Sequence, residues 1–507
     1  MKKTICFLFL IVAVFGSKTP AQEQTAERML SAVELIEDFD VFKRALTAMH
    51  PGLYRYNTPE EIQNNFGALR ANLRQPMPEG EFFKLLAQFT SKLGCGHTYL
   101  NPYNQNKELR ERLFGGKIYF PFYFRLVNGK MIITQNASVQ NLSAGSEITK
   151  INGVRVRQII NSLLTATKSD GENTLAHRIK SIELNGFEAT RHAFFDWYFP
   201  LFFPLENQSF KIEVVDYESK RKVKLTTSAL TKAERTAEME KRYGKTPTYD
   251  DGWKFEILEN SIAYLKIDNS ITWRLTKIKF KDFLSQSFAE IRNRNIKNLI
   301  IDLRGNGGGD TKVGFELARY LAKQKLPRYI QTKHLVRNVQ PQPALAKYFD
   351  TYSDELKFAL TNGVSENLYR KADNNYFEFA FEGNFPEIEP AANNFTGKAF
   401  VISDATNASA TFQFLSYARE NKLAVIVGQE SGGNLQGING DNYFFLNLPN
   451  SKIEIDVPVF FLAPLTPQMD APVFPDKIIE PKINDIAKGL DTELNYVLAQ
   501  IKQTKTE

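Results

Sequence analysis

Residues 298–310, NLIIDLRGNGGGD, decide the fold of the C-terminal half of this chain. The apolar run from Leu299 to Ile301 is typical of a strand buried on both faces. The glycines that follow allow a tight turn and let backbone N–H groups approach a ligand closely. A helical pattern continues over residues 312–323. The stretch therefore predicts a strand, a glycine turn and a helix, the repeating unit of an α/β fold.

The glycine turn does not match the phosphate-binding motifs. The dinucleotide pattern GxGxxG fails because its third glycine would fall on Asp310, and no Gly-Lys-Ser/Thr follows to make a P-loop. Two interpretations stay open at this point. The turn donates backbone N–H groups to an oxyanion, or it only connects a strand to a helix.

The same alternation extends outward from this stretch. Strands are predicted at 262–267, 397–402 and 423–427, and helices at 275–294 and 409–421. Residues 325–395 interrupt the alternation with aromatic and polar sequence. We expect this insertion to cap a site.

A second turn carries a candidate nucleophile. Residues 401–411, VISDATNASAT, run from an apolar strand through small residues into a helix that starts near Ser409. A serine there exposes its hydroxyl at a helix N-terminus, where the N–H of the next residue can face a developing oxyanion. An ordinary N-cap serine fits the same pattern, so the pattern alone leaves the role open.

The third motif is the loop that contains His97. The helical pattern over 81–93 ends at Gly94, and Cys95-Gly96-His97-Thr98 follows. A histidine in a glycine-bounded loop can meet a nucleophile as its general base, although single histidines are more often ordinary surface or core residues. Cys95 is a weaker nucleophile candidate, because no helix N-terminus or basic cluster nearby would lower its pKa.

The N-terminal half combines a helical and a β-rich part. Residues 27–93 read as helical, and residues 115–230 read as β-rich. Two Asn-Gly turns, at 128–129 and 152–153, each join a pair of predicted strands. Polar residues 236–252 predict a domain boundary, and residues 488–501 predict a closing helix.

The first 21 residues, MKKTICFLFLIVAVFGSKTPA, have the pattern of a signal peptide. Their apolar run is too short for an ordinary membrane span, and cleavage is expected after Ala21. An uncleaved membrane anchor is the alternative. We expect export to the periplasm or the extracellular space. No later apolar stretch reaches 18 residues, so no stable membrane span is expected after signal cleavage.

Composition excludes several classes of function. The formal charge of +7 over 507 residues falls to +4 without residues 1–21, which carry three lysines and no acid. No basic run with interleaved aromatic residues appears, so nucleic acid is not an expected partner. The chain has 2 Cys and 5 His, with no HExxH and no zinc-finger spacing. We expect no disulfide framework, no metal and no cofactor.

Taken together, the glycine turn, the Ser409 turn and the His97 loop resemble the tail-specific, C-terminal processing serine peptidases. The likeness is greatest to the branch related to the tricorn protease core, and it covers residues 30–485. The motif order matches: a helical region, a Gly-His-Thr loop, a PDZ-like segment at 144–156, DLRGNxGG, and Ala-Ser-Ala. The stretch 427–433, VGQESGG, is similar to the strand and glycine turn that follow the nucleophile helix in that family.

The resemblance implies roles for individual residues. Ser409 would be the acylated nucleophile, and the N–H groups of Gly308 and Ala410 would form the oxyanion hole. One branch of the family uses a lysine as the base, but Asn434 stands at the ungapped position here. The other branch uses the histidine of the Gly-His-Thr loop, which is His97 in this chain. A histidine base predicts loss of activity below about pH 6–7.

Two departures from the family pattern concern the groups around the base. Cys95 stands where the family often has an acidic residue before Gly-His. The acidic group that orients the histidine is expected near a Gly-Val-x-Pro-Asp motif, which corresponds here to residues 469–476, MDAPVFPD. Asp470 is the candidate there, acting directly or through a relay. Asp476 is expected to cap a turn.

The implied fold is α/β, with a ClpP/crotonase-like peptidase core at 253–487. The expected domains before it are a signal peptide at 1–21, a helical domain at 22–110 and a PDZ-like domain at 111–235; a C-terminal helix and tail at 488–507 follow. The expected activity is that of an exported serine endopeptidase acting on unfolded or C-terminally exposed polypeptides.

Two other functions stay open. The first is a catalytically weak or inactive peptide-binding protein on the same scaffold. The second is an acyl-handling enzyme on a crotonase-like core, which fits poorly with a PDZ-like module and an export signal.

Overall fold

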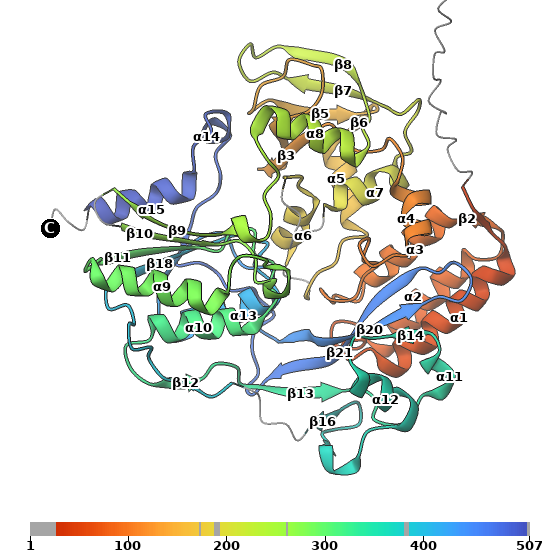
Figure 1. Ribbon diagram of the computed structural model, residues 1–507. Coiled ribbons are helices and arrows are strands. Elements are labelled where there is room, and N and C mark those ends of the chain that lie inside the picture. Colours follow the sequence, from red (N-terminus) through yellow and green to blue (C-terminus); the bar gives the residue numbers. More distant parts are fainter. Residues whose placement is uncertain (1–26, 172–173, 187–192, 260–261, 380–384, 504–507) are drawn as a thin grey trace, which may run out of the picture.

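The computed structural model describes residues 27–171, 174–186, 193–259, 262–379 and 385–503. The predicted signal peptide lies outside these residues. Three six-stranded sheets organise the described part of the chain (Figure 1), and no helix in it is long and apolar enough to cross a membrane.

The first sheet is the α/β core, with strand order β22-β19-β18-β11-β10-β9. Its strands are β9 (Trp253–Leu258), β10 (Ile262–Ile267), β11 (Asn298–Asp302), β18 (Lys398–Ser403), β19 (Val425–Gly428) and β22 (Lys477–Ile478). All neighbouring pairs are parallel except β9 with β10. The strands predicted at 262–267, 397–402 and 423–427 are therefore confirmed to within two residues at either end.

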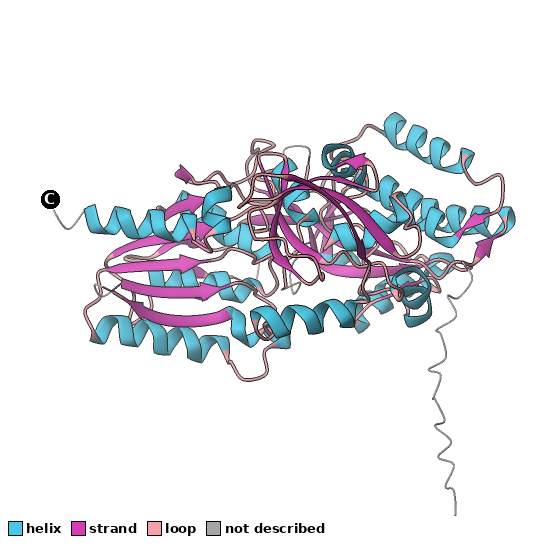
Figure 2. Ribbon diagram, turned by 90° about the horizontal axis from the view of Figure 1, so that it is seen from above, coloured by secondary structure: helices cyan, strands magenta, loops and turns pink. Residues whose placement is uncertain are grey.

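Helices cover both faces of this sheet (Figure 2). One face buries Leu299, Ile301 and Val401 against α9 (Phe280–Asn293), α10 (Thr311–Leu321) and α13 (Ser409–Glu420). The other face packs against Val497 and Ile501 of the closing helix α15 (Thr492–Gln503). The helix α9 begins later than predicted, at Phe280, because the backbone N–H groups of residues 276–278 donate to the Asp250 carboxylate. Burial on both faces explains the continuous apolar run of β11.

The second sheet is antiparallel and reaches away from the core, with order β14-β20-β21-β13-β16-β15. Two long strands, β20 (Ile438–Asn447) and β21 (Glu454–Pro464), form its centre. The other strands are β13 (Thr332–Val336), β14 (Phe349–Asp350), β15 (Tyr369–Lys371) and β16 (Phe377–Phe379), with α11 (Pro343–Ala346), a 3-10 turn (Glu366–Leu368) and α12 (Asp354–Asn362) between them. The insertion 325–395 therefore extends the β20–β21 pair into a sheet. The remaining pair, β12 (Leu326–Arg328) and β17 (Glu387–Ile388), lies at the ends of the insertion.

The N-terminal helices pack against this second sheet (Figure 1). They are α1 (Ala32–Met49), α2 (Pro59–Ala71), α3 (Glu79–Ser91) and α4 (Lys107–Phe114), with the short pair β1 (Met29–Leu30) and β2 (Met77–Pro78). Phe42 and Phe66 share one hydrophobic cluster with Leu446 and Val457. The carboxylate of Asp38 also accepts the N–H groups of Asn450 at 2.8 Å and Ser451 at 2.9 Å. The predicted helical character of residues 27–93 is confirmed.

The third sheet belongs to the segment predicted as β-rich. Its order is β3-β4-β5-β7-β8, from β3 (Phe122–Val127), β4 (Lys130–Asn136), β5 (Glu147–Ile151), β7 (Ser209–Val215) and β8 (Lys222–Ser228), with β6 (Val154–Arg155) paired to β5. Both Asn-Gly turns form, and all four of their residues have positive φ. Such backbone angles are those of the hairpin turns that Asn-Gly favours.

The prediction for residues 115–230 was incomplete, because the segment also holds helices. They are α5 (Val156–Leu164), α6 (Leu175–Ile182) and α7 (Phe194–Phe202), and α8 (Lys232–Tyr243) enters the stretch predicted as a polar boundary. In α5 the apolar residues Val156, Ile159, Ile160 and Leu163 recur at helical spacing and are buried. A 3-10 turn at Asp250–Gly252 then leads into β9, and α14 (Ile483–Ala487) precedes the closing helix.

Candidate active site

Ser409 lies at the turn from β18 into α13 and has a left-handed backbone conformation, with φ of +51°. Residues other than glycine seldom adopt this conformation, and serine gains no local hydrogen bond that would favour it. Strained strand-to-helix turns of this kind expose a nucleophile at the end of a sheet. Ser409 here lines a cleft with a volume of about 810 Å³.

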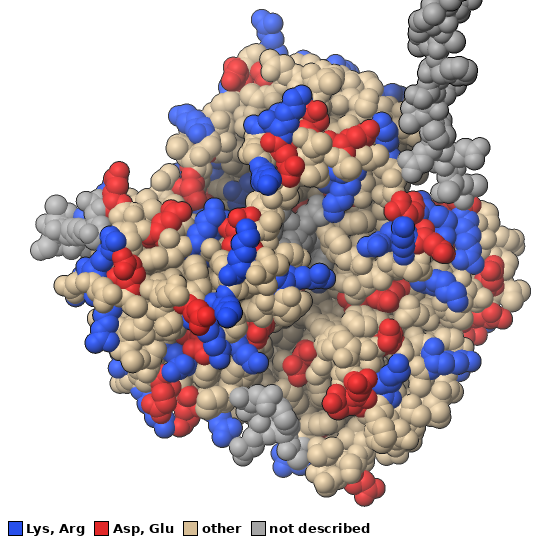
Figure 3. All heavy atoms as spheres, in the orientation of Figure 1, with Lys and Arg blue, Asp and Glu red and all other residues tan. Residues whose placement is uncertain are grey.

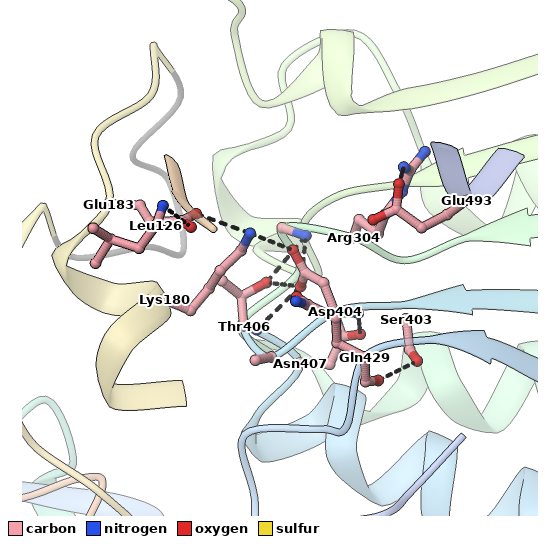
Figure 4. A network of polar contacts seen from close by, with 12 residues as sticks. Leu126, Lys180, Glu183, Arg304, Ser403, Asp404, Thr406, Asn407, Gln429 and Glu493 are labelled. Carbon is pink, nitrogen blue, oxygen red and sulfur yellow. Dashed lines mark hydrogen bonds and ion pairs between the residues drawn. The ribbon is translucent and has the colours of Figure 1, made fainter. Parts of the chain in front are cut away.

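A polar network fastens the two turns of the core to each other (Figure 4). Asp404 accepts the N–H of Gly305 at 3.2 Å, and it also accepts the N–H of Thr406 at 3.0 Å. The side-chain amide of Asn407 donates to the backbone oxygens of Leu303 at 2.6 Å and Asn306 at 3.0 Å. The glycine turn and the Ser409 turn are therefore held as one unit.

Gly308 packs directly against Ser409. A Cβ atom at Gly308 would lie 2.8 Å from the Cβ of Ser409, and φ of Gly308 is +110°, so only glycine fits here. The Gly308 N–H, however, donates to Oδ1 of Asn306 at 3.0 Å. In this conformation one of the two predicted oxyanion donors is thus satisfied within the protein. The other, the N–H of Ala410 in the first turn of α13, makes no hydrogen bond within the described residues.

The loop that carries His97 is fixed on both sides of the histidine. The Gly96 N–H donates to Oδ1 of Asp170 at 2.8 Å, and Oγ1 of Thr98 lies 2.6 Å from Nε2 of His50. The Tyr99 carbonyl accepts the N–H of Asp456 at 3.1 Å, which joins the loop to β21. The structure brings His97 and Ser409 to the same cleft although 312 positions separate them.

The environment of His97 favours the neutral imidazole. Burial, together with the nearby Lys168 ammonium, lowers the pKa of His97 to about 3. The Nδ1 atom of His97 is buried and has no hydrogen-bond partner among the described residues. The histidine is therefore in the form that a general base requires, with one ring nitrogen that no protein group orients.

Asp470 is not brought to His97. Its Oδ1 accepts a short hydrogen bond from the amide of Asn434, and the same amide donates to the Asp170 carbonyl at 3.2 Å. Asn434, at the ungapped position of the family's lysine base, is fully buried and serves this link. Among the described residues, Asp470 makes no hydrogen bond to His97 and lines neither of the cavities that His97 lines. Asp476 accepts the N–H of Ile426 at 2.8 Å, so this carboxylate is structural but holds β19 instead of capping its own turn.

Cys95 is buried in the same loop, and burial raises the pKa of its thiol. It receives a hydrogen bond from the hydroxyl of Thr98 at 3.2 Å. A protonated and enclosed thiol is a poor nucleophile.

Sequence reasoning missed a group of residues from the third-sheet segment that reaches the site. Lys168, Asp170 and His177 line a small cavity beside Ser409 and His97. Nδ1 of His177, in α6, lies 2.7 Å from the Ala405 carbonyl. Also in α6, the Lys180 ammonium lies 2.8 Å from Glu183 and 4.0 Å from Asp404 (Figure 4). The only sequence signal was the polar, glycine-ended stretch 168–171, KSDG, which predicts a turn rather than a site.

The cleft itself has a volume of about 810 Å³ and is lined from all parts of the described chain. Aromatic side chains dominate its walls: Tyr99, Trp273, Tyr352, Phe385, Tyr443 and Phe445. Lys168 is the one Lys or Arg among the described residues that line it, opposite Asp441 and Asp456. On the face seen in Figure 3, basic and acidic groups are interspersed. In the described residues no group of three or more His, Cys, Asp and Glu is arranged to hold a metal.

Comparisons with known proteins give a match to a peptidase family and a similar fold in a solved structure. Residues 261–444 match the model of peptidase family S41. The fold is similar to that of mature CPAF complexed with lactacystin, with a TM-score of 0.60, 13% identity, and coverage of 94% of this chain and 98% of that chain. A CPAF mutant gives a TM-score of 0.61 at 15% identity, over 90% and 94% of the two chains. No curated protein matches the sequence.

Proposed function

Because this chain is a serine peptidase of family S41, we propose that it is an exported endopeptidase of unfolded or C-terminally exposed polypeptides. Ser409 would be the nucleophile and His97 its general base. The observation that carries this proposal is the position of Ser409, in a strained backbone conformation at the N-terminus of α13 and in the cleft that His97 also lines.

The chemistry proposed is acyl transfer. His97 accepts the proton of the Ser409 hydroxyl while the Ser409 oxygen attacks the peptide carbonyl. His97 then gives that proton to the leaving amine. Water hydrolyses the resulting ester with the same base. The Ala410 N–H, at the positive end of the α13 dipole, stabilises the oxyanion. Gly308 contributes a second N–H when it exchanges Oδ1 of Asn306 for the substrate oxygen.

The finer architecture belongs to the same proposal. We assign the parallel sheet with α9, α10 and α13 to a ClpP/crotonase-like core, and the third sheet with α5 to a PDZ-like module. An edge strand of the third sheet could bind an extended peptide by strand addition. The aromatic lining of the cleft suits apolar side chains of an unfolded chain, because rings bury large apolar areas. Export rests on the sequence of residues 1–21 alone.

One observation favours the alternative, a catalytically weak peptide-binding protein. The bond from the Gly308 N–H to Asn306 leaves half of the oxyanion hole occupied by the protein itself. Losing one oxyanion donor costs about 10²–10³ in kcat in other serine peptidases, so such a site would be slow but not silent.

Hydrolysis of an unfolded polypeptide tests the proposal. The mature protein should cleave a reduced, carboxymethylated protein and spare the same protein in its native state, and Ser409→Ala should abolish the cleavage. Equal cleavage by the Ser409→Ala variant would remove Ser409 from the mechanism. A folded wild type without turnover would establish the binding protein instead.

A further inference from the structure

A second, much smaller cavity lies beside the nucleophile. It has a volume of about 60 Å³ and shares His97, Lys168, Gly307 and Ser409 with the walls of the large cleft. Its remaining walls are Gly96, Asp170, His177, Ser181, Thr406 and Ala408. A space of this size accommodates more than one water molecule, and most of its side chains are polar.

Two polar groups of this cavity have no hydrogen-bond partner among the described residues. Nδ1 of His97 is buried and makes no hydrogen bond to a described residue. The Lys168 ammonium makes no hydrogen bond or ion pair in the described part of the chain and lies 4.0 Å from the centre of the Tyr99 ring. Buried polar groups are costly unless they are hydrogen-bonded, and internal water commonly satisfies those that protein atoms do not.

A carboxylate completes the set. Asp170 is 3% exposed; its Oδ1 accepts the Gly96 N–H, and its Oδ2 accepts no hydrogen bond from a described residue. Asp470, in contrast, is engaged by Asn434 and does not line the cavity. Asp456, which lines the large cleft, is also engaged: its carboxylate accepts the side-chain amides of Asn101 at 3.1 Å and Asn104 at 2.9 Å.

We propose that Asp170 is the acidic group that positions His97, through a water molecule held in this cavity. The inference rests on the proposed function, since it completes the same catalytic apparatus. The water accepts hydrogen bonds from Nδ1–H of His97 and from Lys168, and it donates to Oδ2 of Asp170. This arrangement fixes the tautomer in which Nε2 is the free base. Asp170 stays ionised throughout and stabilises the imidazolium that forms when His97 takes the proton of Ser409.

The charges around His97 are balanced in this arrangement. The Lys168 ammonium, the His177 imidazole and the Asp170 carboxylate line the small cavity. On the side of the second sheet, the Tyr443 ring packs near His97, and Asp456 lines the large cleft. Burial raises the pKa of Asp170, and the Gly96 N–H, the Arg55 guanidinium and the Lys168 ammonium limit that rise. α6 forms one wall and is itself tied to the Ser409 turn through His177.

The test compares two substitutions that act on the relay from different sides. Asp170→Asn keeps an oxygen for the Gly96 N–H but removes the charge. Ser181→Val fills the cavity from α6 and removes only a hydroxyl that donates to the Arg178 carbonyl within its own helix. Asp470→Asn is the matched control for a carboxylate outside the cavity, and Ser181→Ala is the control that keeps the space.

We expect Asp170→Asn and Ser181→Val each to lower kcat on a peptide substrate at least about tenfold with KM nearly unchanged. The loss should stay below the roughly 10⁴-fold seen where the acid touches the histidine directly. The double variant should be no slower than Asp170→Asn alone, because both changes break one relay. The two controls should keep kcat within about twofold.

Full kcat in folded Asp170→Asn, additive losses in the double variant, or a large loss in Asp470→Asn would each overturn the inference. Failure of the proposed function would look different. In that case wild type itself would neither turn over peptide nor react at Ser409, and no variant would be slower than wild type.

Discussion

At the scale of single residues, the φ of +51° at Ser409 is a cost in stability that the proposed role of nucleophile would explain. A left-handed conformation costs a residue with a Cβ about 1–2 kcal/mol, and glycine avoids this cost. We expect Ser409→Gly to be more stable than Ser409→Ala by about 1 kcal/mol although both are inactive. Denaturant unfolding of the two variants measures the difference. Equal midpoints would show that the turn is not strained.

The ionisation of His97 predicts an unusual pH profile. Burial and Lys168 lower its pKa to about 3, so falling pH does not protonate the base until well below the ordinary value for histidine. This shifts the acid limb from the pH 6–7 that the sequence predicts. The rate of Ser409 acylation should therefore stay above half its maximum down to about pH 5. A half-loss near pH 6.5 would mean that His97 is solvated in the working enzyme.

The sequence was informative for residues whose neighbours in the chain define their role. Ser409, Ala410, Gly308 and His97 sit in short motifs, and the structure brings Ser409, Gly308 and His97 to one cleft, with Ala410 next to Ser409 in the first turn of α13. Asp170 and Lys168 escaped notice because the residues that they contact, Gly96 and Tyr99, lie about 70 positions away and no local pattern links them. Asp470 was chosen by motif position, and the amide of Asn434 engages it instead.

At the scale of elements, α6 links the third sheet to the Ser409 turn. The Lys180 ammonium faces Glu183 and Asp404, whose side chains are 4% and 5% exposed. We expect Lys180→Met to lower kcat several-fold with little change in KM, because the turn before Ser409 loses the ion pair between Lys180 and Asp404. Lys150→Met is the control, since Lys150 and Glu213 form a half-exposed pair in the same segment. Equal kcat in both variants would contradict a role for α6 in placing the nucleophile.

Arg304 links β11 to the closing helix. Its guanidinium contacts Asp302 at 2.6 Å, Asp491 at 2.7 Å and Glu493 at 3.2 Å, and Asp302 and Glu493 are each 2% exposed. Arg304→Met should destabilise the protein by about 3–5 kcal/mol, because it leaves buried carboxylates unpaired. The exposed Arg370–Glu378 pair offers a control, and Arg370→Met should cost less than about 1 kcal/mol. Similar unfolding midpoints for the two variants would refute this difference.

Most strands and helices of the core followed from sequence because short apolar runs, helical periodicity and glycine turns are local signals. β10 was placed to the residue, and α13 to within one residue. The strands of the insertion 325–395 were not predicted from the sequence, because they are stabilised by pairing with β20 and β21 and have no clear pattern of their own. Tertiary pairing of this kind leaves little trace in a short segment.

At the scale of the whole molecule, the chain does not divide into independent units along its sequence. The hydrophobic cluster of the N-terminal helices includes Phe444, Leu446, Ile455 and Val457 from the C-terminal half. A fragment of residues 253–507 would expose these side chains, and we expect it to be unfolded or aggregated. Circular dichroism and limited proteolysis of the fragment check this expectation. A cooperative thermal transition would contradict it.

The cleft is likewise a property of the assembled chain. His97 comes from the N-terminal region, Lys168 from the third-sheet segment, Ser409 from the core and Tyr443 from the second sheet. Each lies on a different element, so small movements between the sheets change the geometry of the site. Such a composite site suits the proposed activity, in which an extended polypeptide binds before it reacts.

The most direct test of the central claim is labelling of the mature protein with a fluorophosphonate probe at about pH 8, beside Ser409→Ala and His97→Ala. An activated serine reacts with such a probe only when a base assists it. We predict one label per chain on wild type, located at Ser409, and none on either variant. Labelling that persists in folded Ser409→Ala, or its absence in folded wild type, would contradict the claim that Ser409 and His97 form a serine peptidase site.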